Sequence, residues 1–137
     1  MKVSPYLNFD GNCEEAMSFY AACTGGQVVA MMKFAGTPAE AHVPPEMKDK
    51  VLHACLSFNG TELMASDAAC GRKEPQGFSV ALHVTDPAEA ERVFHALAEG
   101  GKVEMPIQQT FWAERFGSLV DRYGISWMVN CDGGRSR

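Results

Sequence analysis

Hydrophobic and polar residues alternate along the first stretch of the chain, and the period then changes. From Val3, the segment VSPYLNF places apolar residues and proline at every second position, which is typical of a half-buried strand. After the turn DGN, apolar residues recur at helical spacing between Cys13 and Ala21. The pair Gly25-Gly26 ends this predicted helix, because glycine enters the left-handed cap conformation without steric cost. The next segment, QVVAMMKF, predicts a second strand.

The same order of elements returns at a fixed offset of 75 residues. FSVALHV predicts a strand, Asp86-Pro87 a helix start with proline in the first turn, and AEAERVFHALAE an amphipathic helix. Gly100-Gly101 then ends the helix before the strand KVEM. Identical residues fall on each other at this offset, among them Glu14 and Glu89, Phe19 and Phe94, and Val28 and Val103. Such a period indicates two copies of one structural unit.

Each copy is followed by a predicted hairpin. VLHACLSFNGTELMASD turns at Asn59-Gly60, and GSLVDRYGISWMVN turns at Tyr123-Gly124. A long loop with three prolines, residues 35–50, is found only in the first half. We therefore predict an α+β fold of two βαβββ modules that form a curved mixed sheet around a cleft. The modules, residues 1–69 and 70–137, would together make a single domain spanning 1–137.

Composition narrows the classes of function. The 137 residues carry a net charge of −5, which does not favour a nucleic-acid partner. No apolar run approaches the roughly 20 residues needed to cross a bilayer, so no membrane partner is expected. The N-terminus lacks the apolar core of a signal peptide, which indicates a cytoplasmic protein. The five cysteines form no CxxC pair, and we expect reduced, buried thiols.

Three sequence blocks carry a resemblance to a known family. They are SPYLNFDGNCEEAMSFY, ELMASDA and QQTFWAERFGSLVDRYGISWMVN. With the paired βαβββ pattern, they make the chain resemble PhnB-like proteins, also labelled 3-demethylubiquinone 3-methyltransferase-like. These belong to the vicinal oxygen chelate superfamily, which includes glyoxalase I and bleomycin-resistance proteins. The resemblance covers almost the whole chain and implies the glyoxalase/bleomycin resistance fold. It leaves the function open, because this fold hosts isomerases, dioxygenases and binding proteins.

The resemblance also implies positions for a metal. In the metalloenzymes of the superfamily, four ligands come from the first and last strands of the two modules. Those positions correspond here to Ser4, Ser79, Met64 and Met128. Hydroxyls and thioethers are poor ligands for zinc, nickel, manganese or ferrous ion, so we predict that the inherited metal site is lost and that no cofactor is bound.

A different metal site is the weaker alternative. Strand alternation places His53 and His83 on the cleft side, and Asp67 follows the fourth strand. Together these three would resemble a facial triad. The other interpretation, which we favour, is that they are polar side chains lining a pocket and held by hydrogen bonds.

The connection QQTFWAERFG, residues 108–117, concentrates aromatic residues. Phe111, Trp112 and Phe116 either fill the core or form a flap over the cleft, and the sequence does not separate these interpretations. Trp127 is different, because its place in the alternation predicts that it faces the helix as part of the core.

The resemblance and its label raise three candidate functions. The favoured one is a metal-independent protein that binds a small molecule; its predicted lining residues are Tyr6, Asn8, His53, Ser79, His83, Trp112 and Met128. The alternative is an isomerase, lyase or dioxygenase of the same superfamily, metal-dependent or using His53 or His83 as general base. A true methyltransferase is not expected, because the chain has no glycine-rich turn of a doubly wound sheet. The superfamily resemblance and the exposed strand edges predict a homodimer.

Overall fold

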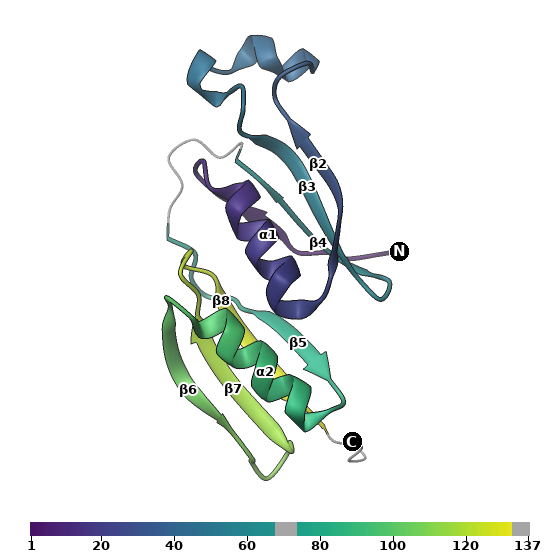
Figure 1. Cartoon of the computed structure of the whole chain (residues 1–137), viewed down its shortest axis with the longest axis vertical. Helices are drawn as coiled ribbons and strands as arrows, with labels where there is room; N and C mark the ends of the chain where they lie inside the picture. Colours follow the sequence, from purple (N-terminus) through teal and green to yellow (C-terminus); the bar gives the residue numbers. More distant parts are fainter. Residues whose placement is uncertain (68–73, 133–137) are drawn as a thin grey trace. The chain divides into compact units, whose positions relative to one another are not determined.

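The computed structural model describes residues 1–67 and 74–132. The fold divides into two compact units, Met1–Lys73 and Glu74–Arg137, each with its own helix and sheet (Figure 1). The module boundary predicted between residues 69 and 70 lies outside the described residues, as does Cys70.

The first unit is a four-stranded mixed sheet with one helix. Its strands lie in the order β1-β4-β3-β2, with β1 parallel to β4 and the other pairs antiparallel. The elements are β1 (Tyr6–Asn8), α1 (Cys13–Thr24), β2 (Gln27–Lys33), β3 (Val51–Phe58) and β4 (Thr61–Ser66). The long loop between β2 and β3 contains two short 3₁₀ helices, Pro38–His42 and Pro45–Met47.

The second unit repeats this topology in the order β5-β8-β7-β6. Its elements are β5 (Val80–Val84), α2 (Pro87–Ala98), β6 (Lys102–Gln108), β7 (Arg115–Val120) and β8 (Ser126–Cys131). The predicted α+β class and the paired βαβββ modules are confirmed. The strands are arranged as two four-stranded sheets, one in each unit.

The strand register shows that the sequence repeat is a structural repeat. Tyr6 lies opposite Met64 in the first unit, and Ala81 lies opposite Met128 in the second. The offset is 75 residues between the first strands but 64 between the last, because the loop between β2 and β3 lengthens only the first module. The first strand is shorter than predicted. It begins at Tyr6, and Val3 is 89% exposed, since the parallel ladder with β4 starts at Met64.

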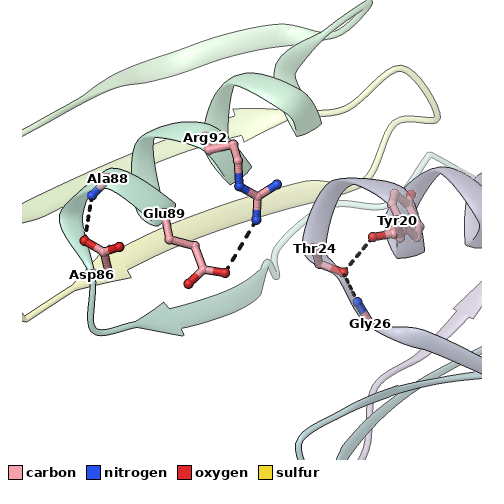
Figure 2. Close-up of polar contacts among 7 residues, drawn as sticks. All are labelled: Tyr20, Thr24, Gly26, Asp86, Ala88, Glu89 and Arg92. Carbon is pink, nitrogen blue, oxygen red and sulfur yellow. Dashed lines mark hydrogen bonds and ion pairs between the residues drawn. The ribbon is translucent and has the colours of Figure 1, made fainter.

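Local side-chain contacts fix the helix ends (Figure 2). Asp86 accepts a hydrogen bond from the Ala88 amide at 3.1 Å, which caps the start of α2, and Pro87 follows in the first turn as predicted. At the end of α1, the Thr24 hydroxyl donates to the Tyr20 carbonyl at 2.7 Å and accepts from the Gly26 amide at 3.2 Å. Gly25 has a φ of 78°, which confirms the predicted left-handed cap.

Within each unit, the helix packs on one face of its own sheet. The buried faces are apolar: α1 contributes Cys13, Ala16, Met17, Tyr20 and Cys23, and α2 contributes Ala90, Val93, Phe94 and Leu97. Trp127 is fully buried, which confirms the prediction that it belongs to the core. In the first sheet, Ala54 and Leu63 are buried toward α1. Strand alternation therefore turns His53 and Met64 to the opposite face, which we call the open face.

Candidate functional site

On the open face of the first sheet, the structure brings two predicted ligand-binding residues together. The Tyr6 hydroxyl lies 3.0 Å from Nδ1 of His53, and the two ring centroids are 5.8 Å apart. Asn8 projects to the same face, because it lies two residues after Tyr6 on β1. Tyr6 remains 44% exposed and His53 is half-buried, so a ligand can reach both rings.

The hydrogen-bond roles in the Tyr6–His53 contact depend on the tautomer of the imidazole. Burial raises the pKa of Tyr6, and a hydrogen bond with Ser66 acts in the opposite direction. The phenol therefore stays protonated and either donates to Nδ1 or accepts from it. In the first case Nε2 of His53 carries a hydrogen and is a donor; in the second it carries a lone pair and is an acceptor or base.

Asp67, the third member of the alternative metal cluster, is already engaged. Its buried carboxylate accepts hydrogen bonds from the amides of Gly11 at 2.8 Å, Cys13 at 3.0 Å and Val51 at 3.0 Å. These contacts join the start of α1 to the start of β3. A carboxylate held by three amide donors stabilises the fold.

The Cys13 thiol next to Asp67 is suppressed as a nucleophile. Burial raises its pKa to about 12, and the charges of Asp67 and Glu14 act in the same direction. Because the thiolate is the reactive form, this cysteine is inert at neutral pH. Cys23, Cys55 and Cys131 are also buried cysteines.

The second sheet presents a different set on the face away from α2. His83 lies opposite Asn130, which in turn lies opposite Phe116, so the three side chains form a row across the sheet. His83 is exposed. Met128 lies two residues before Asn130 on β8 and therefore on the same face. The hydroxyl oxygens of Ser79 and Ser126 are 2.7 Å apart. The predicted residues Ser79, His83 and Met128 thus sit on or beside β5 and β8.

The aromatic connection is a hairpin tip between β6 and β7. The Thr110 amide donates to the Ala113 carbonyl, and the Ala113 amide to the Thr110 hydroxyl, both at 3.0 Å. The Trp112 ring makes edge-to-face contacts with two phenylalanines, and its centroid lies 4.8 Å from that of Phe111 and 5.5 Å from that of Phe116. Phe111 is 91% exposed and Trp112 47%, so the interpretation of these two as core residues is wrong. Their role as a flap stays a prediction.

A sequence profile described as 3-demethylubiquinone-9 3-methyltransferase matches residues 1–130. The chain belongs to this PhnB-like family. The predicted resemblance is therefore confirmed. Within this family member, the described residues form two mixed sheets and include no doubly wound parallel sheet.

Relatives and solved structures agree with this membership. Protein YjdN of Escherichia coli is 35% identical over 139 residues, covering 95% of both chains. The structure of protein PA1353 from Pseudomonas aeruginosa is similar with a TM-score of 0.86 and 46% identity, covering 96% of this chain and 98% of that one. A putative 3-demethylubiquinone-9 3-methyltransferase, PhnB protein, from Bacillus cereus has a TM-score of 0.79 and 28% identity, covering 96% and 99%.

The wider superfamily fold is also confirmed. A glyoxalase/bleomycin resistance protein/dioxygenase family enzyme from Burkholderia phytofirmans matches with a TM-score of 0.63 at 14% identity, covering 93% of this chain and 96% of that one. This is a likeness of fold. Among the helices described for this family member, none is long and apolar enough to cross a membrane.

The side chains at the inherited ligand positions do not fit a divalent metal. Ser4 precedes β1, the hydroxyl of Ser79 pairs with that of Ser126, and Met64 and Met128 supply thioethers. Hard or borderline divalent ions prefer imidazole and carboxylate ligands. Within residues 1–67 and 74–132, no three His, Cys, Asp or Glu side chains are grouped to hold a metal.

Sequence reasoning missed two contacts of the first sheet. It did not pair Tyr6 with His53, because the two residues lie on β1 and β3 with β4 between them. It also missed Glu62, which forms a 2.7 Å ion pair with Lys2 and accepts a hydrogen bond from the Cys55 thiol. Strand alternation could predict that Tyr6 and His53 lie on the same face of the sheet. Whether their side chains meet across β4 depends on the register of the strands.

Proposed function

We propose that this chain binds a small molecule on the open face of its first sheet, without a divalent metal. The observation that carries this proposal is the 3.0 Å contact between the Tyr6 hydroxyl and His53 Nδ1 on a partly exposed surface. The contact orients the imidazole and leaves Nε2 for a ligand. A few oriented polar groups among apolar side chains are typical of small-molecule sites.

The test is a fragment screen followed by affinity measurements on variants. His53→Ala is expected to weaken a captured ligand by about tenfold, the value of one hydrogen bond. Tyr6→Phe is expected to weaken it less, because it removes only the group that orients the ring. His95→Ala is the matched control, since His95 lies on the outer surface of α2, and its affinity should equal that of the wild type. Equal affinity in His53→Ala would contradict the proposal.

The same measurements separate metal-free binding from a metal site. After dialysis against a chelator, the ligand affinity and the melting temperature are expected to be unchanged. A bound divalent ion at a hundredfold excess over its Kd would add about 2.7 kcal/mol of stability, which the chelator would remove. Trp112→Ala and His83→Ala test the predicted residues of the second sheet separately.

An isomerase or lyase is the alternative, and the same contact favours it in one tautomer. If the Tyr6 hydroxyl accepts the Nδ1 hydrogen, Nε2 of His53 is free to take a proton from a substrate. Under this alternative, Tyr6→Phe lowers turnover more than it lowers substrate affinity. Under the binding proposal no turnover is found for any captured ligand.

The chain is further proposed to form a homodimer. The outermost strands β2 and β6 occupy equivalent places in the two modules, and both expose apolar side chains. Val28, Val29, Val103 and Met105 are between 38% and 56% exposed. A second copy of the chain carries the same two strands. Symmetric association of the two copies would cover the exposed apolar side chains of both.

Light scattering at micromolar concentration is expected to give twice the mass of the 14.9 kDa chain. Val103→Lys together with Val28→Lys should shift the mass toward the monomer, because both changes put charge into the covered surface. A Glu104→Lys variant alters charge at an exposed position of β6 beside Val103 and serves as the control. A monomeric wild type would refute the proposal.

A further inference from the structure

Residues with soft metal-ligating side chains are neighbours on the open face of the first sheet. In the antiparallel register, Cys55 lies directly opposite Met64, and His53 directly opposite Met32. Directly opposite residues have Cβ atoms about 4.5–5.5 Å apart. Since His53 and Cys55 are two residues apart on β3, the two pairs are adjacent on the same face.

The intervening residues confirm which face this is. Ala54, Leu63 and Ala65 are almost fully buried on the side of α1. Met32 is 50% exposed, His53 and Met64 are half-buried, and Cys55 is 6% exposed. The cluster is thus accessible at its rim and sheltered at the thiol.

We propose that Cys55, Met64 and His53, with Met32 at the rim, form a binding site for a monovalent soft metal ion, copper(I) in particular. Thiolate and thioether sulfur are the ligands that copper(I) prefers, and imidazole is a good partner for it. The donors differ from the inherited set, whose only member here is Met64. The site is compatible with the absence of a divalent metal, because the same sulfur atoms disfavour harder ions.

The neighbouring residues suit such a site. The hydroxyl of Tyr6 contacts Nδ1 of His53, so Nε2 is the nitrogen left for a metal, and the hydroxyl then accepts the Nδ1 hydrogen. On binding, the Cys55 S–H bond breaks, a sulfur–copper bond forms and one proton is released. The proton passes to water, because the neighbouring Glu62 carboxylate is held in an ion pair with Lys2. No oxidant or reductant is consumed.

The second module provides a matched control. Its equivalent strands carry Ser118 opposite Met128 where the first module has Cys55 opposite Met64, and Phe116 replaces His53. A thioether at Met128 therefore has the hydroxyl of Ser118 opposite it in place of a thiol, and His83 on β5 as its diagonal imidazole neighbour. If sulfur alone sufficed, both methionines would contribute equally.

The experiment is an anaerobic titration with copper(I), using competition with a chromophoric copper(I) chelator, and a parallel titration with silver(I). One ion per chain is expected in the wild type. Cys55→Ser and Met64→Leu are each expected to weaken binding by at least about tenfold, and Met128→Leu to leave it unchanged. Far-UV circular dichroism checks that each variant is folded. If Cys55→Ser does not fold, Met64→Leu still tests the site, because leucine keeps the apolar volume of methionine. Unchanged affinity in Met64→Leu, or an equal loss in Met128→Leu, would overturn the proposal.

Discussion

Replacing Asp67 with alanine is expected to lower the free energy of unfolding by about 3–5 kcal/mol. The change leaves three buried amides, those of Gly11, Cys13 and Val51, without their carboxylate acceptor. It also releases the start of α1 from the start of β3. Because small domains are stable by only about 5–15 kcal/mol, this loss should be visible as a large fall in melting temperature.

Denaturant unfolding followed by circular dichroism measures the effect. Asp67→Asn should cost less, because the amide oxygen still accepts from part of the set while its NH₂ group faces a donor. Asp49→Ala is the control: this exposed aspartate should change stability by no more than about 0.5 kcal/mol. A wild-type midpoint for Asp67→Ala would show that the carboxylate is not a structural anchor and would reopen its role as a ligand.

Replacing Asp121 with alanine is expected to destabilise the second module by a similar amount, about 3–5 kcal/mol. This buried carboxylate accepts from the amides of Tyr123 at 2.8 Å and Ile125 at 3.0 Å, and from the indole Nε1 of Trp127 at 2.8 Å. It therefore holds the turn between β7 and β8 and orients the largest buried side chain.

A double-mutant cycle isolates the indole contact. Trp127→Phe removes the N–H and part of the ring volume, so it destabilises by itself. If the Asp121–Trp127 hydrogen bond is real, the double variant Asp121→Ala/Trp127→Phe should be less destabilised than the sum of the single variants. Additive effects would contradict the contact.

The fold could be predicted because the residues that start and end its helices act locally. The glycine pairs at the helix ends and the Asp86-Pro87 start act within a few residues, and the copied pattern indicated a copied module. The first strand was predicted too long because alternation continues through Val3, while the ladder with β4 begins only at Tyr6. The alternation of apolar and polar residues shows which side chains could be buried on one face. A strand forms only where a neighbouring strand also pairs with its backbone.

The site was predicted less well, because partners distant in sequence determine what a polar residue does. Asp67 was a reasonable metal-ligand candidate by residue type, yet its carboxylate holds amides from two remote segments. Strand alternation predicted that His53 faces away from α1, but its contact with Tyr6 depends on β4 lying between them. Trp112 could be read as core or surface until the hairpin tip placed it outside.

The outer strands β2 and β6 also limit how copies of this chain can aggregate. Both strands are irregular, with register shifts after Val28 and Val103, and β6 contains Pro106, which has no amide hydrogen. An edge strand with such interruptions pairs poorly with a strand from another chain. Repeated pairing of this kind is the route by which exposed sheet edges form fibrils. The apolar side chains of these strands can therefore meet a neighbour through their faces, while the backbone resists open-ended polymerisation.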